Sequence, residues 1–488
     1  MPNLIDRIVG WVNPHAGIAR HFARRQLERA YEAASPRDSW RPRRAGASAN
    51  ADHRADAKTL RTKARALVQN VPYIWAGLDG LAVATVGAGI IPRATGREKD
   101  KINLLLKEWW KVCDADGRFD FFGLVKAAYV AMERDGEVLV RLRSRRPTDG
   151  LPVPLQLQLL EIDWIDDARS GTFNGNQIIN GIEYDMLGAV AAYYLWDQHP
   201  GEVAVVRGRA QSQRVPGKDL IHLFNPDRPG QGRGFTRLAP VISRTRDLQL
   251  YEDAELARKN LETRLSVLAS GDLTTMDNPA GMGEAGGVQG QGARDLGELG
   301  GGGIVGMPAG MNFTVVEPKA APGYVDYLKF NLHLIAAGMG VPYHLLTGDM
   351  NEVNFSSARV RLLDFRRAVT QMQWLTLIPK LLVPIHDAFI EHAYLAGKIQ
   401  VRDKAVDFSP PKWDYVNPEQ DVKADLAEIS GGLASISEKL RQRGYDPDVV
   451  FAELKGDIDK LRALGILDVM LFLQRGNLPT QQTTDKNS

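Results

Sequence analysis

Residues 340–359 read GVPYHLLTGDMNEVNFSSAR, and this stretch predicts a loop that leads into a long helix. Gly340 and Pro342 end the apolar helical pattern before it, because glycine tolerates the left-handed cap and proline cannot donate its amide. The glycine, aspartate and asparagine residues that follow favour turns, so we expect an exposed polar loop. Ser356 and Ser357 then offer hydroxyls that are typical of a helix N-cap.

The helical pattern behind this loop continues to about Ala396. Four arginines are interleaved with its apolar positions: Arg359, Arg361, Arg366 and Arg367. Cations this dense on a partly apolar helix are expected to have partners within the chain or on neighbouring subunits, and spacing alone does not separate acidic partners from phosphates. Pro379 and Pro384 do not interrupt the apolar periodicity, so we expect kinks there instead of helix ends.

Composition indicates a globular chain of more than one domain. Of its 488 residues 44% are hydrophobic and 25% are charged, and 61 Lys and Arg oppose 59 Asp and Glu. No run of about 18 apolar residues and no signal-type segment occurs, so we expect an intracellular protein without a membrane partner. Cys113 is the only cysteine, which excludes an intramolecular disulfide and indicates a buried structural thiol.

The first half of the chain predicts an α+β region. Residues 1–54 form an arginine-rich arm, which we expect to be a solvated tail or to dock on an acidic partner or nucleic acid. Helical patterns cover about residues 55–85, 98–112 and 121–134. Short alternating runs then predict strands at 90–92, 137–143, 155–165, 178–184, 189–196, 203–207 and 220–224. His222 lies in an apolar strand, so we interpret it as a core histidine.

The second half is mostly helical. We expect one helix from Thr236 to about Ala269, on the order of 45 Å long, and a second over 325–339. The glycine-rich stretch between them, from Gly271 to about Gly310, predicts flexible chain with short strands pairing 304–307 with 313–316. After an irregular crossing over 401–408, helices are expected from Asn417 onward, including 449–454 and 458–473, with a break at Gly431 and a cap at Ser435 or Ser437.

Motifs for catalysis are weak throughout the sequence. Gly281–Gly286 matches G-x-G-x-x-G but has no strand before it and no helix after it, and 208–219 lacks the spacing of a phosphate-binding loop. Asp163, Asp166 and Asp167 cluster at a strand end, where carboxylates suit a metal-dependent nuclease, yet no further ligand stands at clear spacing. A DNA-processing enzyme or minor head protein with a cryptic carboxylate site therefore remains the alternative, which oligomeric mass would distinguish.

The stretch GVPYHLLTGDMNEVNFSSARVRLLDFRRAV, residues 340–369, resembles the signature of lambda-type bacteriophage portal proteins. Three further segments resemble the same family in matching order: RTKARALVQNVPYIWAGLDGLAVATVGAGIIP at 61–92, RPGQGRGFTRLAPVISRTRDLQLYEDAELARK at 228–259, and NPEQDVKADLAEISGGLASISEKLRQRGYDPDVVFAEL at 417–454. The resemblance covers roughly residues 55 to 470.

The resemblance implies an α+β, multidomain portal fold. Its parts would be an α/β wing, a helical stem, a small clip, a long kinked helix with a tunnel loop, and an all-helical crown. The corresponding ranges are the N-terminal arm 1–54, wing 55–235, first stem helix 236–270, clip 271–322, second stem helix 323–341, tunnel loop 342–358, long helix and return to the wing 359–415, crown 416–474 and polar tail 475–488.

The same resemblance implies which residues meet DNA or neighbouring copies. The tunnel loop would line the narrowest part of a channel with Asp349, Met350, Asn351, Glu352, Val353 and Asn354. Subunit interface or channel positions would be Arg359, Arg361, Arg366, Arg367, Arg246 and Lys259.

The implied function is a ring of twelve copies at one capsid vertex, through which double-stranded DNA passes during packaging and ejection. Implied partners are the terminase large subunit, the major capsid or scaffold protein, and head-tail connector proteins. We expect such a protein to be assembled in the host cytoplasm, to belong to the virion, to bind no cofactor and no metal, and to catalyse no reaction. A near-zero net charge suits a conduit that surrounds DNA without gripping it, which is a hypothesis.

Overall fold

The computed structural model describes residues 47–202, 211–263, 267–270, 312–315, 323–351, 355–413, 418–443, 445 and 447–466, without the side chains of 261–270, 312–315 and 355–358. Several expectations therefore lie outside the described residues. They concern nearly all of the N-terminal arm, the strand at 203–207, the strand at 304–307 with most of the range 271–322, Glu352 to Asn354 of the loop, and the polar tail.

Two helices joined at a proline start the described chain. α3 (Ala49–Asn70) begins where the Ser48 hydroxyl accepts a hydrogen bond from the Ala51 amide, and α4 (Pro72–Thr85) follows with Pro72 in its first turn. α5 (Lys99–Trp109) and α6 (Phe121–Asp135) complete the N-terminal helices. These helices confirm the predicted ones, except that the first starts six residues earlier than the periodicity indicates.

Two antiparallel sheets follow the N-terminal helices. The first has the order β3-β2-β9, with β2 (Glu137–Ser144) between β3 (Leu155–Glu161) and β9 (Leu220–Phe224). The second runs in chain order through β4 (Gly171–Phe173), β5 (Asn176–Ile179), β6 (Ile182–Tyr184), β7 (Val190–Trp196) and β8 (Ser212–Pro216). The apolar cluster between them includes Leu139, Leu160, Leu195 and Val215.

The predicted strand over 178–184 is wrong, because it is the hairpin β5–β6. Asn180 and Gly181 both have left-handed backbone angles, with φ of 49° and 79°, and Ile179 pairs with Ile182. An Asn-Gly pair with positive φ at both positions is the preferred two-residue hairpin turn. Similarly, the run 155–165 ends as a strand at Glu161 and continues as a 3₁₀ turn, Ile162–Trp164.

The long helix behind the loop is confirmed and runs through both prolines. It consists of α10 (Phe355–Met372), a π-helical segment (Gln373–Leu382) and α11 (Val383–Leu395). Pro379 lies inside the π-helical segment, whose wider turns accommodate a residue that lacks an amide donor. The face that recurs every four residues is buried in the main core and comprises Leu377, Leu381, Ile385 and Phe389.

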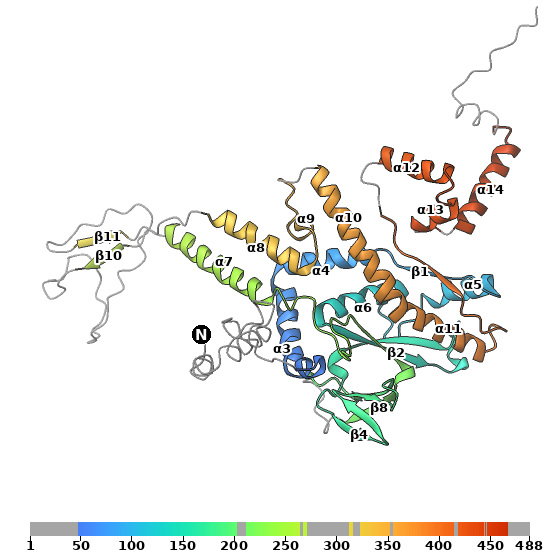
Figure 1. Cartoon of the computed structure of the whole chain (residues 1–488), viewed down its shortest axis with the longest axis horizontal. Helices are drawn as coiled ribbons and strands as arrows, with labels where there is room; N and C mark the ends of the chain where they lie inside the picture. The colour runs from blue at the N-terminus through green and yellow to red at the C-terminus, as the bar shows by residue number, and fades with distance from the viewer. Residues whose placement is uncertain are drawn as a thin grey trace, which may run out of the picture.

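Helices α7 (Ile242–Thr263) and α8 (Tyr324–Met339) form a hairpin that runs away from the sheets toward β10 and β11 (Figure 1). Arg244 Nη1 donates to Asn331 Oδ1 at 2.8 Å, and the ring of Tyr251 lies 4.6 Å from that of Tyr327. α7 has 22 residues and is about 33 Å long. The expected helix to Ala269 is wrong, because Val267–Ser270 forms strand β10.

Strand β10 pairs with β11 (Asn312–Val315). The expected pairing of 313–316 with 304–307 concerns a strand outside the described residues. The residues Val267 to Ala269 fit the helical pattern, but β-branched and apolar residues also fit a strand, and the pairing with β11 decides between them. The local periodicity of the sequence gives no information about this pairing between distant strands.

The C-terminal part returns to the body of the chain before forming three helices. β12 (Val406–Ser409) pairs with β1 (Ile91–Ala94), so the crossing expected to be irregular ends in a strand. The helices are α12 (Pro418–Ser430), α13 (Ile436–Gln442) and α14 (Pro447–Ala463). The expected division of the last helix is wrong, since α14 passes through Gly456, whose cost in a helix is only about 1 kcal/mol.

Candidate functional site

The loop before the long helix starts from a well-formed helix end. Gly340 has φ of 72°, and the amides of Gly340 and Val341 bond the carbonyls of Ala337 and Ala336 at 3.1 and 3.0 Å. This confirms the predicted end of the helix. The following residues Tyr343–Thr347 form a short helix, α9, which the sequence analysis treats as loop. Gly348, also with φ of 72°, ends α9.

Asp349 organises the turn that follows α9. Its Oδ1 accepts the Asn351 amide at 3.0 Å, its Oδ2 lies 3.5 Å from the Tyr343 hydroxyl, and its own amide donates to Thr347 Oγ1 at 3.1 Å. This is the side-chain-closed turn that aspartate favours. Met350, 59% exposed, and Asn351 project from the turn. Glu352, Val353 and Asn354 lie outside the described residues.

The base of this loop is anchored on α4. A Cβ atom at Gly77 would lie 2.7 Å from Met339 Cε and 2.8 Å from Leu346 Cδ1, so α8 and α9 approach α4 closely at this glycine. The rings of His333 and Tyr343 stack at 4.0 Å. The pKa of His344 is lowered by burial and by Arg361. The loop therefore has a fixed base and an exposed tip.

Three of the four arginines on α10 have partners within the chain, and two of these partners lie outside the helix. Arg359 Nη2 lies 3.0 Å from Asp421 Oδ1 on α12, and the Arg366 guanidinium lies 5.0 Å from the centre of the Trp413 ring. Arg359 therefore joins α10 to α12, and Arg366 joins α10 to the chain just before α12. Arg359 thus has an acidic partner within the same chain.

The remaining predicted cations are exposed. Arg367 pairs with Asp364 at 3.2 Å on the same helix surface, and Arg361 lies near His344. Arg246 and Lys259 are exposed on α7, and within the described residues Arg246 has no ion pair. Four arginines of one sequence cluster therefore have four different surroundings.

Ser356 and Ser357 do not cap α10 from outside it. The helix already includes Phe355, so both serines belong to its first turn, and this expectation is corrected. Serine is also compatible with the first turn of a helix, so its presence does not fix the boundary to a single residue.

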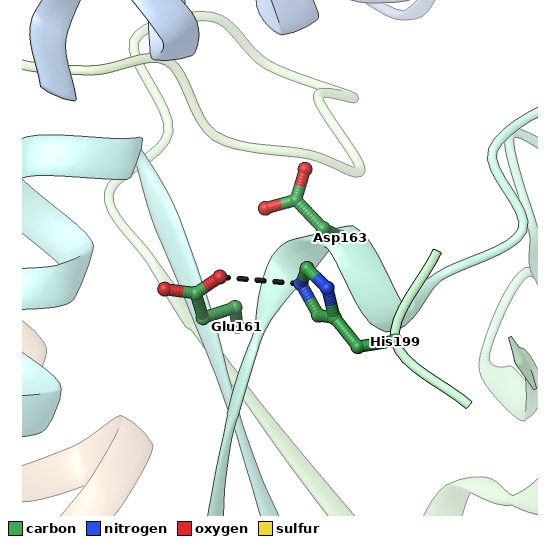
Figure 2. Close-up of side chains that lie close together, drawn as sticks. All are labelled: Glu161, Asp163 and His199. Atoms are coloured by element: carbon green, nitrogen blue, oxygen red, sulfur yellow. Dashed lines mark ion pairs between the residues drawn. The ribbon is translucent and has the colours of Figure 1, made fainter. Parts of the chain in front are cut away.

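The aspartates that suggested a metal site do not all meet. Asp163 comes together instead with Glu161 and with His199, a residue that the sequence analysis did not single out (Figure 2). One ligand atom of each lies within 4.8 Å of the others, and His199 Nε2 is 3.3 Å from Glu161 Oε2. Among the residues that the structure describes, this is the one group with metal-ligand geometry.

Arginines already neutralise these carboxylates. Asp163 Oδ1 accepts from Arg61 at 2.9 Å and its Oδ2 accepts from Arg65 at 2.6 Å, while Arg134 lies 3.8 Å from Glu161. A divalent cation would have to displace these guanidinium groups and would be repelled by them. The cluster is therefore an ion-pair network that joins α3 and α6 to the end of β3, and it does not fit a metal.

A second, buried network surrounds Glu137 at the start of β2. The carboxylate accepts from Arg233 at 2.7 and 2.8 Å, from His222 Nε2 at 2.9 Å and from the Gly234 amide at 3.0 Å, and His53 Nε2 lies at 3.3 Å. Burial raises the pKa of Glu137, but these donors outweigh burial and hold it well below its usual range. His222 is thus a satisfied core histidine, as expected.

Two further expectations concern membranes and thiol chemistry. Among the described residues, no helix combines the length and the apolar character needed to span a bilayer. Cys113 is buried, and burial together with Asp114 and Asp120 raises its pKa to about 12. A thiol with such a pKa is unreactive at neutral pH, which agrees with the expected structural role.

Solved structures with a similar chain come from gene transfer agent particles. One is described as the neck of the native particle computed with C12 symmetry, with 17% identity, a TM-score of 0.44, and coverage of 85% of this chain and 97% of that chain. Another is described as the virion of the native particle, with 18% identity, a TM-score of 0.41, and coverage of 80% and 94%.

Sequence comparison identifies phage relatives. A "Probable portal protein" of Halomonas phage phiHAP-1 is 28% identical over 451 residues, which are 88% of this chain and 85% of the relative. The "Portal protein" of Escherichia phage N15 is 21% identical over 323 residues, 59% of each chain. Residues 35–373, well over half of the chain and including the loop and α10, match the family described as "Phage portal protein, lambda family". The chain therefore belongs to the lambda family of phage portal proteins.

Proposed function

We propose that the chain assembles into a closed ring of twelve copies at one capsid vertex and that double-stranded DNA passes through the ring during packaging and ejection. Family membership supports the portal role, and the number twelve follows from the resemblance described for the sequence. The protein contributes geometry and charge, and it catalyses no reaction.

The observation that supports ring formation is the apolar surface left on the hairpin of α7 and α8. These helices pack on each other, yet Leu256 and Phe330 remain 61% exposed, Val325 57% and Leu250 50%. Large exposed apolar side chains are unfavourable in water, and a second copy is the partner that a repeated interface would supply. A repeated interface between two different faces of one chain closes into a ring when its rotation divides a full turn without a rise along the axis.

The loop that follows α9 is proposed to face the passage. Its anchored base and its exposed tip at Met350 and Asn351 suit a segment that meets a passing duplex without holding it. Asp349 stabilises the turn and therefore contributes shape more than charge. In this proposal Glu352 to Asn354 continue the same surface.

The partners follow from the same arrangement. In the proposal, residues 271–322 are the clip that contacts the terminase large subunit and later the head-tail connector proteins. The sheets contact the major capsid or scaffold protein, and assembly takes place in the host cytoplasm before the ring becomes part of the virion. The carboxylate cluster of Glu161 and Asp163 does not support the alternative nuclease, because arginines occupy both oxygens of Asp163.

Particle mass and symmetry test the ring. Twelve chains of 53.9 kDa give about 650 kDa, and class averages down the axis should show an annulus. Phe330→Asp should reduce assembly, because it places a charge in the proposed interface. Met186→Asp, at an exposed apolar residue in the turn between β6 and β7, should leave assembly unchanged. A chain that stays monomeric at every concentration tested would refute the proposal.

A further inference from the structure

Strand β2 carries a row of arginines on one face. Arg141 and Arg143 lie two residues apart, and Arg145 continues the row just beyond the strand. Side chains at alternate positions of a strand point to the same face, about 6.7 Å apart. Burial lowers the pKa of Arg143, and the positive charges of Arg141 and Arg145 lower it further. The three guanidinium groups therefore repel one another.

No carboxylate pairs with these three arginines among the described residues. Arg143 Nε donates to Gln158 Oε1 and Arg145 Nε to Gln156 Oε1, each at 2.9 Å, and both acceptors are neutral. The guanidinium of Arg141 forms no hydrogen bond or ion pair with any described residue. By contrast, Arg65, Arg214 and Arg233 each form an ion pair with a carboxylate at 2.7–2.9 Å.

The nearest acids do not neutralise the row. The charge of Asp116 raises the pKa of Arg143, but the two form no ion pair, and Asp116 Oδ1 accepts from Gln158 Nε2 at 3.4 Å. Asp197 lines the groove and accepts the Gln211 amide at 3.0 Å, without an ion pair to the row among the described residues. The arginine row therefore carries excess positive charge.

Two arginines of the row, Arg141 and Arg143, border a groove of about 200 Å³ between the two sheets, and Arg145 continues the row beyond the lining of the groove. Arg141, Arg143 and Gln158 line it from the first sheet, and Gln213 and Val215 of β8 line it from the second. Arg214, between them in sequence, faces the other side of its sheet and pairs with Glu183 at 2.8 Å. Leu160 and Leu195 of the apolar cluster also border the groove, together with Trp164 and Trp196.

We propose that this groove binds an extended acidic segment of a partner protein. An extended peptide repeats its side chains with the same period as β2, so carboxylates at alternate positions match Arg141, Arg143 and Arg145. Each guanidinium accommodates a carboxylate in the two-bond geometry that makes such pairs strong. The intervening apolar side chains of the peptide contact Leu160, Val215 and the two tryptophans.

Nucleic acid fits the groove less well than an acidic peptide. A duplex is far wider than a cavity of this volume, and the aliphatic side chains Leu160, Leu195 and Val215 beside the arginines suit the apolar side chains of a peptide. Asp197 at the rim would also face successive phosphates, whereas a peptide can present a neutral residue there. The mixture of cations and apolar contacts therefore favours a peptide.

The binding test uses the full-length assembled protein and a fluorescent twelve-residue peptide with Glu at alternate positions, separated by Val and Thr. The matched control peptide has Gln at every Glu position. We expect the Glu peptide to bind, with an affinity that falls as NaCl rises, and the Gln peptide not to bind at the same concentrations.

Substitutions in the groove test whether the Glu peptide binds there. Arg141→Gln/Arg143→Gln should weaken the Glu peptide about tenfold or more. Arg54→Gln/Lys58→Gln removes two exposed charges from α3 and should change nothing. Gln158→Glu keeps all the arginines but gives Arg143 a carboxylate within the chain, so it should also weaken binding of the Glu peptide. This variant provides the test if the double variant does not fold.

Four outcomes would overturn the proposal. The first is equal affinity for the Glu and Gln peptides, and the second is unchanged binding in both groove variants. The third is that a single-stranded DNA oligonucleotide binds more tightly than the Glu peptide and loses affinity in the same variants, which would make the groove a nucleic-acid site. Loss of ring assembly in Gln158→Glu would equally overturn it, since the groove would then be a contact between copies.

Discussion

His386 on α11 is expected to make the long helix sensitive to acid. The residue is 2% exposed, and neither ring nitrogen has a hydrogen-bond partner among the described residues. Burial lowers its pKa to about 4, with a smaller lowering by Lys404 and an opposing effect of Asp387. The imidazole is therefore neutral in the folded chain at neutral pH.

The direction of the pH effect follows from the two pKa values of His386. The folded-state pKa of about 4 lies below the unfolded value of 6.5, so the unfolded state binds the proton first as the pH falls. The contribution to stability is complete above about pH 6.5 and is lost as the pH falls from there toward 4. At pH 5 the loss amounts to about 2 kcal/mol, and below pH 4 it levels off near 3 kcal/mol.

Hydrogen exchange of α11 amides measures this loss locally, which is preferable because a multidomain chain does not unfold in one step. After correction for intrinsic exchange, the protection of residues 383–395 should fall by about 2 kcal/mol between pH 7.5 and 5. In His386→Leu this pH dependence should disappear, and protection at pH 7.5 should rise because two buried unsatisfied nitrogens are removed. The matched control His199→Leu changes a half-exposed histidine and should retain the pH dependence of α11. If His386→Leu keeps the pH dependence of the original chain, the reasoning is refuted.

Three further predictions concern the ion pairs and the loop. Glu137→Gln should reduce the free energy of unfolding by about 3 kcal/mol, because it leaves Arg233 buried without a counter-charge, whereas the exposed Glu108→Gln should have little effect in the same denaturation assay. Arg359→Gln breaks a half-exposed pair and should raise hydrogen exchange in α12 by an amount below about 1 kcal/mol, with ring mass unchanged. Shortening 348–354 should leave rings intact in micrographs but reduce DNA packaging or retention, and loss of assembly would instead assign the loop to the subunit interface.

Sequence patterns predicted the elements whose signals are local. The end of α8 at Gly340, the passage of the long helix through Pro379 and the burial of Cys113 all depend on a residue and its immediate neighbours. The hairpin at Asn180 was also readable, because Asn-Gly is a turn signal, but the apolar alternation on both sides of it suggested a continuous strand. The end of α7 was not readable, since strand β10 depends on a partner more than 40 residues away.

The candidate site was predicted as a segment but not as a set of contacts. Arg359 and Asp421 are 62 residues apart, Glu137 and Arg233 are 96 apart, and nothing in the local sequence marks either pair. For the arginines of β2, the alternate spacing is visible in the sequence. Their neutral partners Gln156 and Gln158 are identified only once the pairing of β2 with β3 is known. A charge without a counter-charge is a property of the folded surroundings. For that reason, a binding site for a partner is indicated by charged side chains that lack a counter-charge in the folded chain. The densest cation clusters of the sequence do not indicate it.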